Sequence, residues 1–569
     1  MLILGAYDRH DASAAVFEDY RLKAAVALER LTRIKGDGYR FPAEAVDECL
    51  SIAGATRREV DVVCLPRTKY EPRYFHRKLV DVIGLGGLRS HELIREMAFW
   101  GTTDPLTLFD GARWLADHGF RPNARIHFYN HHKAHALAAL FHMQSDDAVA
   151  WTADGYGDRV YYSLYRLKDG QLTAPIGGEA ESLIRGRAQK RESAMGRLYH
   201  DATEALGFRP MRHEGKVLGL AAFGQPVFFD ELRAFYRVTS DGRIEATASR
   251  RTIRDAIRRI AKQGPRDAVA ASVQGVLESV MLEAMDRIVG RDKPKGLGVA
   301  GGVFSNVKLN QRLAERFPFE EVFVYPAMTD CGEPAGGVLD FLLARDGLPR
   351  WLGERTVLPD VYFGRDYDDV ADEAFRQAGA TAVASGDVAT AVAGLVADGK
   401  IVGTYLGRME YGPRALGART ILASATDRRI NDWMNKRLDR TEFMPFAPVV
   451  QADRAAEPFL LGANMRYSAR FMTITCDVAK AWQERIPAVV HVDGTARPQL
   501  VEREQNPVYH DILTAYEKQT GLPVLINTSF NAHEEPIINA PAECVKALKD
   551  GRVDYVTTKQ AVWSFAPTA

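Results

Sequence analysis

The amino-acid sequence predicts an α/β protein built from more than one domain, and three observations support that prediction. The chain opens with a short apolar strand at residues 2–6, which a polar turn joins to the apolar segments 12–17 and 22–28. Much later, residues 296–310 combine a strand, a Gly-Gly turn and the start of a helix. Glycines and prolines gather at 347–360, and helix-like and strand-like patterns begin again after them. The 569 residues suffice for two or three sizeable cores, and the junction divides the chain into 1–353 and 354–569.

The opening hairpin carries the first candidate for chemistry. Its tight first loop contains Asp8, His10 and Asp11, and Ser13 follows at the start of the next strand. Actin-like ATPases begin with such a hairpin, whose loop backbone faces the nucleotide phosphates. The loop lacks the glycines that usually line a phosphate cradle, so it needs support from the rest of the chain.

Two histidines mark a predicted metal site. On a helix over residues 129–140, His131 and His135 lie one turn apart on the same face and can clamp one cation. Asp154 ends the apolar strand 148–153, and Asp330 follows a second strand before a glycine-bearing turn. Two imidazoles and two carboxylates suit iron, manganese or zinc better than a structural thiolate zinc site. The alternative is a pair of ordinary histidines on an Ala/Leu-rich helix.

The glycine-rich segment after residue 296 is the second nucleotide-type signal. Gly301 and Gly302 would let a ligand approach the backbone, and Asn306 and Asn310 can present amides from successive helical turns to a ribose or base. Gly336, followed by another glycine, would admit a purine against the backbone in the same way. An ordinary strand-to-helix turn remains the alternative for the whole segment.

The second domain contains arginines in marked loops. Helix-like patterns at 367–377 and 388–398 precede a strand at 401–406, which runs into a loop bearing Arg414 and Arg419. Arg440 and Arg497 follow in further polar loops, and a strand at 523–526 ends in the neutral groups Asn527 and Ser529. Guanidinium groups match phosphate and carboxylate oxygens, so this domain is predicted to hold an anion. The basic run 250–259 is instead interpreted as the solvated face of a helix.

The amino-acid composition indicates which kinds of binding partner to expect. Lys+Arg and Asp+Glu both number 74, so no long-range field attracts nucleic acid or an anionic membrane. The five cysteines are scattered without a CxxC spacing, which favours a reducing compartment. The N-terminus lacks a basic leader, and no apolar run is expected to approach transmembrane length. We therefore expect a cytoplasmic protein with neither a nucleic-acid partner nor a membrane partner.

At this point the chain resembles a known family, the NodU/CmcH-type carbamoyltransferases, over nearly its whole length. The resemblance rests on an ordered set of motifs: HDASAA from His10, ALERLTRIK from Ala27, HHKAHALAAL from His131, TADGYGD from Thr152, EGKVLGLAAFG from Glu214, AGGVFSN from Ala300, GPRALGART from Gly412, RTEFMPFAP from Arg440 and LINTSFN from Leu525.

The resemblance implies a fold and a reaction. The N-terminal domain is expected to be similar to the actin-like ATPase fold of the threonylcarbamoyl-tRNA synthesis proteins, and the C-terminal domain to the YrdC-like α/β fold. Carbamoyl phosphate would be broken down in the second domain, and the carbamate would pass internally to the first. ATP would convert it to carbamoyl adenylate with release of pyrophosphate. The carbamoyl group would then go to a hydroxyl, or as second choice an amine, of a natural product such as a macrolide or sugar.

Residue roles follow from the matched motifs. The resemblance implies that the four predicted ligands bind Fe²⁺ or another divalent metal. It also implies that Mg²⁺ can bind together with ATP. His10 matches a histidine placed to act as base toward the acceptor, and Lys35 matches a lysine near the phosphates. The carbamoyl phosphate site is implied at Arg414, Arg419, Arg440, Arg497, Asn527 and Ser529. The sequence departs from the family pattern at two places. The segment after Arg440 is shorter than in relatives, and Glu534 stands where glycine is common in relatives.

Two other enzyme classes remain open. A metal-dependent hydrolase could use the same histidines, but the helix carries no glutamate to act as base. A threonylcarbamoyl-tRNA enzyme would need a basic surface, which the balanced charge does not predict. A homodimer is compatible with the resemblance. The acceptor is undefined: the aromatic-rich segment 74–120, with Trp100, Phe109 and Trp114, is predicted either to cover it or to be ordinary core.

Overall fold

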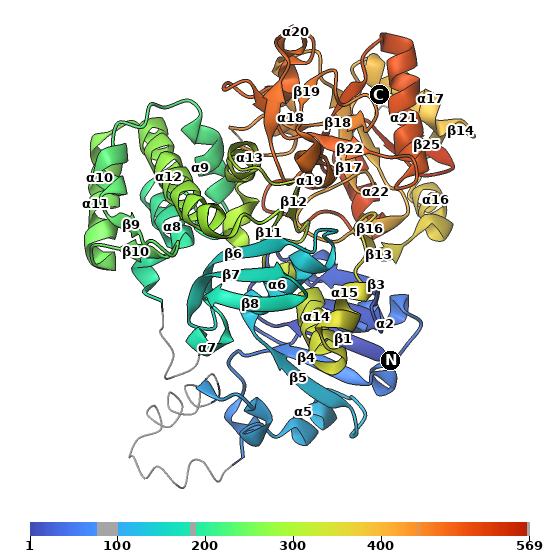
Figure 1. Cartoon of the computed structure of the whole chain (residues 1–569). Coiled ribbons are helices and arrows are strands. Elements are labelled where there is room, and N and C mark those ends of the chain that lie inside the picture. Colours follow the sequence, from blue (N-terminus) through green and yellow to red (C-terminus); the bar gives the residue numbers. More distant parts are fainter. Residues whose placement is uncertain (77–98, 100, 183–188, 442, 566–569) are drawn as a thin grey trace.

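The structure is a computed structural model that describes residues 1–569 except 77–98, 100, 183–188, 442 and 566–569 (Figure 1). Two five-stranded sheets and their helices form the N-terminal part of the chain, and a third, larger sheet forms the C-terminal part, coloured orange to red in Figure 1. A group of helices, coloured green, packs beside the second sheet.

The two N-terminal sheets share one topology. In the first, of order β3-β2-β1-β4-β5, three antiparallel strands precede two that run parallel to β1. In the second, of order β12-β11-β6-β7-β8, β6, β7 and β8 are again antiparallel, and β11 and β12 again run parallel to the first strand. This duplication confirms the predicted actin-like fold. The strands are β1 Leu2–Tyr7, β2 Ser13–Glu18, β3 Arg21–Ala27, β4 Val62–Pro66, β5 Arg125–Tyr129, β6 Ala148–Gly157, β7 Val160–Lys168, β8 Gln171–Ile176, β11 Gly296–Ala300 and β12 Glu321–Val324.

Helices α6 (His131–Phe141) and α14 (Glu333–Asp346) are packed together between the two sheets. α14 contacts β1, β2, β4 and β5, whereas α6 contacts β6 and β11. Gly336 lies in α14, where a Cβ would come within 2.1 Å of the Ala134 carbonyl oxygen of α6. The prediction that Gly336 admits a purine is therefore wrong, because this glycine serves the close contact of two buried helices.

The remaining N-terminal helices flank these sheets. α12 is long and apolar enough to cross a bilayer, which the sequence pattern did not indicate, yet 72% of its apolar window is buried in the protein. It packs against α8, α9, α10 and α13, and is therefore a core helix. The basic run forms α11, with Ile253, Ile257 and Ile260 buried. The helices are α1 Glu29–Thr32, α2 Ala43–Ile52, α5 Gly111–Asp117, α7 Glu179–Ser182, α8 Met195–Ala205, α9 Glu214–Ala221, α10 Phe229–Arg233, α11 Arg250–Gln263, α12 Arg266–Asp292, α13 Val307–Arg316 and α15 Leu348–Gly353; β9 Tyr236–Val238 pairs with β10 Ile244–Ala246.

The C-terminal part is built on a mixed eight-stranded sheet of order β14-β25-β24-β15-β17-β23-β18-β22. The predicted helices 367–377 and 388–398 are confirmed as α16 and α17, while the predicted strand at 401–406 is the shorter β15. The elements are β13 Tyr362–Asp366, α16 Asp368–Gln377, β14 Thr381–Ser385, α17 Val388–Ala397, β15 Val402–Thr404, β16 Arg408–Glu410, β17 Thr420–Ser424, α18 Arg429–Arg437, β18 Ala447–Gln451, β19 Phe459–Leu460, α19 Arg466–Ala469, β20 Cys476–Val478, α20 Lys480–Gln483, β21 Thr495–Ala496, β22 Gln499–Val501, α21 Pro507–Thr520, β23 Val524–Ser529, α22 Pro541–Lys549, β24 Tyr555–Thr557 and β25 Ala561–Ser564.

Two further sequence predictions concern the domain boundary after residue 353 and the acceptor segment 74–120. α15 ends at Gly353 and β13 begins at Tyr362, so the proposed boundary after residue 353 falls between elements. In the predicted acceptor segment, Trp100 and residues 77–98 lie outside the described part. Phe109 and Trp114 are buried in the core, where Phe109 contacts the rings of Tyr70 and Phe128. Those two aromatics support the core alternative.

Candidate active site

The four predicted metal ligands lie together between the two N-terminal sheets. α6 presents His131 and His135, β6 presents Asp154, and Asp330 precedes α14; one ligand atom from each lies within 4.8 Å of the others. The Nε2 atom of His135 lies 3.4 Å from Asp154 Oδ2 and 3.6 Å from Asp330 Oδ1. Both histidine Nε2 atoms are buried without a hydrogen-bond partner in the described chain. A divalent cation would satisfy these nitrogen atoms and the facing carboxylates, so the donor set fits the predicted metal.

Glu333 is a fifth ionisable group at the cluster, which the sequence interpretation missed. It is fully buried, with one carboxylate oxygen 3.2 Å from His135 Nε2 and the other 3.6 Å from His131 Nδ1. Burial raises the pKa of Glu333 to about 8, against the opposing effect of the two histidines. Its position three residues after Asp330, at the start of α14, is the signal that could have identified it.

Neighbouring groups orient the ligands. The hydroxyl of Tyr7, at the end of β1, donates a hydrogen bond to Asp330. The His131 backbone N–H donates to Asp158 at 2.8 Å, and a Cβ at Gly157 would overlap the His131 ring. His132 takes no part, because its ring nitrogens contact Thr152 Oγ1 and the Val160 carbonyl. Burial lowers the pKa of His132 well below its usual value, so this histidine is neutral.

A cleft of about 790 Å³ opens beside the cluster and is lined by His131, Asp154 and Asp330. His10 also lines it, with Nε2 3.4 Å from Asp330 Oδ2 and Nδ1 3.6 Å from Asp11 Oδ2. Burial opposes the charge on His10, but Asp330 and Asp11 outweigh it and raise its pKa to about 9. Lys35 faces the same cleft and contacts Glu29 at 2.9 Å. The structure therefore brings both predicted catalytic residues to the metal-type cluster.

The glycine-rich turn after β11 also reaches the cleft. Gly301 has a φ of 99°, and a Cβ there would meet the Ala153 carbonyl oxygen at 2.3 Å, so only glycine fits. The Gly302 backbone N–H donates to Asp154 Oδ2 at 3.1 Å. Asn306 lines the cleft and caps α13 by accepting from the Leu309 N–H.

The structure places Asn310, predicted to face a nucleotide, away from the lining of the cleft. Its side chain is 1% exposed and donates to the carbonyl oxygens of Phe304 and Thr473, each at 2.8 Å. Thr473 belongs to the C-terminal part of the chain, so Asn310 joins the two parts instead of contacting a ligand. The helical spacing from Asn306 cannot reveal this, because it depends on which neighbour covers α13.

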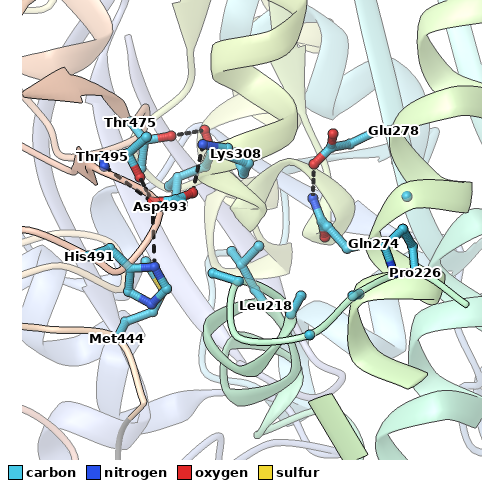
Figure 2. Close-up of a pocket in the computed structure, with 16 residues that line it drawn as sticks. Leu218, Pro226, Gln274, Glu278, Lys308, Met444, Thr475, His491, Asp493 and Thr495 are labelled. Carbon is cyan, nitrogen blue, oxygen red and sulfur yellow. Dashed lines mark hydrogen bonds and ion pairs between the residues drawn. The ribbon is translucent and has the colours of Figure 1, made fainter. Parts of the chain in front are cut away.

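A second cavity, of about 240 Å³, lies between α9, α12 and α13 and the C-terminal loops (Figure 2). One polar wall holds His491 and the Lys308–Asp493 ion pair at 2.8 Å; the facing wall holds Gln274, which donates to Glu278 at 2.6 Å. Leu218 lines both this cavity and the main cleft. Asn306 donates to Gln274 Oε1 at 2.8 Å, so a hydrogen bond joins the walls of the two cavities.

The predicted anion residues separate into different environments. Arg414 lines the main cleft. Arg440 donates to Thr528 Oγ1 and to the Ser529 carbonyl oxygen, each at 2.8 Å, so it lies beside Ser529 at the end of β23. Asn527 is 1% exposed and donates to Gln499 and to the Ala415 carbonyl oxygen.

Arg419, predicted to hold carbamoyl phosphate, lies buried in the C-terminal part. Arg419 is 0% exposed and donates to the carbonyl oxygens of Leu406, Gly407 and Ala418. Its guanidinium also stacks on the Tyr405 ring, 3.8 Å from the centroid. These contacts hold the loop before β17 from inside the core. Arg497 is half-buried immediately after β21.

Comparison with known proteins identifies the sequence relatives. Residues 2–339 match the family model described as Carbamoyltransferase N-terminus, and residues 393–564 match Carbamoyltransferase C-terminus. Nodulation protein NolNO of Sinorhizobium fredii is 31% identical over 556 residues, covering 94% of this chain and 76% of that protein. Nodulation protein NolO of Bradyrhizobium diazoefficiens is 33% identical over 431 residues, covering 73% and 75%. Nodulation protein U of Azorhizobium caulinodans is 33% identical over 305 residues, covering 53% and 51%.

Similar solved structures include full-length HypF in the phosphate- and nucleotide-bound form, with a TM-score of 0.33 and 13% identity, covering 61% of this chain and 56% of that one. The ROK hexokinase from Thermus thermophilus has a TM-score of 0.31 and 17% identity, covering 61% and 100%. These TM-scores are too low to transfer any property of the site. The fold assignment rests on the sheet topology described above.

Proposed function

Because this chain belongs to the carbamoyltransferase family, we propose that it is an ATP-dependent enzyme that takes its carbamoyl group from carbamoyl phosphate. In this proposal the C-terminal domain releases carbamate, and the N-terminal cleft converts it with ATP to carbamoyl adenylate and pyrophosphate. An acceptor hydroxyl, or an amine as second choice, then displaces AMP. The observation that carries the proposal is the meeting of the buried His131, His135, Asp154 and Asp330 cluster with a glycine turn and His10 in one cleft.

The nucleotide fits the cleft at the end marked by Gly302 and Asn306. Gly302 lies where its backbone closely approaches Asp154, and its lack of a side chain leaves room for phosphate oxygens there. The base end would point toward Leu218 and the smaller cavity, whose wall includes small residues such as Ala221 and Gly275. Asn306 and Gln274 would then hold the ribose or base by hydrogen bonds.

The metal proposed for the cluster is Fe²⁺, with other divalent cations as alternatives and Mg²⁺ as a further companion of ATP. When bound, such a cation supplies positive charge that stabilises the phosphate oxygens of the nucleotide. His131, His135, Asp154 and Asp330 would hold it, and Tyr7 and Glu333 would orient these ligands. Glu333 is fully buried beside the two histidines and does not line the cleft.

His10 is the proposed base for transfer to the acceptor. A hydroxyl becomes a good nucleophile only as its proton leaves, and an imidazole facing the cleft can accept that proton. His10 can do so only when neutral, which requires that the charge of Asp330 and Asp11 beside it be compensated. Lys35 is proposed to contact the phosphates from the same wall.

The donor site is proposed at Arg440, Arg497, Asn527 and Ser529, with Arg414 at the entrance to the cleft. Arg440 and Ser529 lie side by side, which supports a shared anion pocket at the end of β23. Carbamate is short-lived in water, and an internal passage from this pocket to the cleft would protect it.

Since all five cysteines are free and buried, we further propose a cytoplasmic location.

Pyrophosphate release tests the proposal. The metal-loaded protein, given ATP and carbamoyl phosphate without acceptor, should release pyrophosphate and form carbamoyl adenylate detectable by mass spectrometry. His135→Ala should abolish both, because it removes a ligand. Release of ADP without pyrophosphate from the wild-type protein would contradict adenylation and favour a different use of ATP.

A further inference from the structure

A second group of side chains that could bind a metal lies where the N-terminal and C-terminal parts of the chain meet. Its residues are different from the four ligands of the central cluster. His213 precedes α9, and His533 and Glu534 lie in the loop that follows β23. His213 Nε2 is 2.7 Å from Glu534 Oε1, and His533 Nε2 is 3.8 Å from the same oxygen. The two rings are stacked, with centroids 5.8 Å apart. One ligand atom from each of the three residues lies within 4.8 Å of the others.

We propose that His213, His533 and Glu534 bind a divalent transition metal, with zinc as the best match, across the boundary between the N-terminal and C-terminal parts. Two imidazole nitrogens and one carboxylate oxygen are a preferred zinc donor set, and a water can complete the tetrahedron. All three side chains are partly exposed, at 17%, 26% and 37%, so an aqueous metal ion can reach them.

The contacts around the three residues leave His213 Nε2, His533 Nε2 and Glu534 Oε1 facing one another. Arg209 contacts the other carboxylate oxygen, Glu534 Oε2, at 3.3 Å, so Oε1 is the oxygen that faces the two imidazoles. The backbone N–H of Arg209 donates to His213 Nδ1 at 3.2 Å, which places the proton of the neutral ring on Nε2. Metal binding at Nε2 therefore moves that proton to Nδ1 and opens the Arg209 contact. This exchange predicts a moderate affinity for the metal.

The site lies between loops that belong to the two proposed pockets. Asn531, two residues before His533, accepts a hydrogen bond from Arg440 at 2.8 Å. Arg212, the neighbour of His213, donates to the Lys35 carbonyl oxygen at 2.8 Å and contacts Asp11. A metal at this position would connect the loop of the donor pocket to the loop beside His10. Its expected effect is to stiffen the junction, not to take part in the chemistry.

Zinc stoichiometry tests the site in the full-length protein. After equilibrium dialysis against micromolar Zn²⁺ at pH 7.5, elemental analysis should find two zinc ions per wild-type chain and one in His533→Ala and in His213→Ala. His510→Ala, a partly exposed histidine in the C-terminal part, is the matched control and should keep two. His135→Ala should also lose one, but from the other cluster, so failure of either assignment is visible separately.

Cobalt substitution supplies a second readout that does not depend on counting alone. Co²⁺ at a site with two imidazoles and a carboxylate absorbs in the visible range, and this band should diminish in His533→Ala but persist in His510→Ala. Circular dichroism should be the same for all variants, because the three residues are at the surface. If His213→Ala and His533→Ala retain the wild-type zinc count and the wild-type cobalt spectrum, the interdomain site does not exist.

Discussion

The histidines of α6 show that the role of a side chain depends on the residues that surround it. His131 and His132 are adjacent in sequence, yet His131 faces the carboxylates and His132 is neutral, satisfied by Thr152 and the Val160 carbonyl. The difference follows from the helical rotation of about 100° between neighbouring residues. Spacing alone therefore identifies His131 and His135 as a pair and excludes His132.

The first prediction at this scale concerns His135. Because its Nε2 atom is buried and faces two carboxylates, His135→Ala should remove the metal from the central cluster and abolish carbamoyl transfer. Phosphate release from carbamoyl phosphate should persist, since the donor pocket is proposed to lie in the other domain. Elemental analysis and a phosphate assay check the two statements. Unchanged iron content in the variant would show that the cluster is not the metal site.

Glu333→Gln is expected to keep the fold and to weaken metal binding roughly ten- to hundredfold, the usual effect of removing a partner behind a metal ligand. The amide has nearly the same shape, but it replaces a carboxyl oxygen beside His131 and His135 with an NH2 group, which cannot accept a hydrogen bond. Competition with a chelator measures the affinity. Asp346→Asn, at the C-terminal end of the same helix, is the control and should bind metal normally. Equal affinities for the Glu333 variant and the wild type would refute this role.

His10→Asn should retain metal and nucleotide while losing transfer to a hydroxyl acceptor by about a hundredfold or more, the typical contribution of a general base. Asn keeps a polar side chain on the β1–β2 loop but cannot accept the proton at neutral pH. Formation of carbamoyl adenylate should suffer less than transfer. A variant that transfers at the wild-type rate would leave His10 with a structural role only.

At the scale of elements, α14 is held against α6 and β5 by one buried carboxylate. Asp340 contacts Lys133 of α6 at 3.0 Å and His127 of β5 at 2.9 Å. Burial alone would raise its pKa, but Lys133 and His127 outweigh burial and lower it to about 2. The folded pKa lies below the unfolded value of 3.8, so this stabilisation is present above pH 4 and is lost as the pH falls toward 2.

Asp340→Asn should therefore lower the free energy of unfolding by about 2 kcal/mol at pH 7, from a pKa shift of nearly two units. The difference between variant and wild type should begin to shrink below pH 4, where Asp340 of the unfolded chain becomes protonated, and should be largely lost near pH 2, where the folded carboxylate is protonated as well. Chemical denaturation at pH 7 and pH 3.5 measures it. A stability difference that is constant with pH would mean that the charge of Asp340 does not stabilise α14.

The elements also show where sequence interpretation succeeds and fails. The α6 helix, the opening hairpin and the turn at Gly301 carry local signals, namely four-residue spacing, alternating apolar segments and glycine, and each is confirmed. Arg419, Asn310 and Gly336 have equally suggestive local settings but face carbonyl groups of other segments. Asn310 and Gly336 contact residues distant in sequence, whereas Arg419 contacts carbonyl groups 12 and 13 residues earlier in the chain. Residue spacing alone predicts neither kind of contact. Glu333 was missed because its partners come from α6, about 200 residues earlier.

At the scale of the whole molecule, the two proposed pockets belong to different parts of one chain, and several contacts join them. Arg33 donates to the carbonyl oxygens of Pro536 and Ile537, and Arg30 donates to the Gly412 carbonyl oxygen. These arginines follow β3 in the N-terminal part, whereas their partners lie in the C-terminal part. The contacts support a fixed arrangement of the domains, which an internal passage for carbamate requires.

The most direct test of this two-pocket account supplies the intermediate from outside. Arg497→Ala should lose most of its activity with carbamoyl phosphate and ATP, yet transfer the carbamoyl group at nearly the wild-type rate when given synthetic carbamoyl adenylate. The assay needs an acceptor, for which a panel of hydroxylated natural products can be screened by the mass gain of one carbamoyl group. The account predicts rescue by the adenylate. An equal loss with both donors would contradict it, because donor breakdown and transfer would then share one site.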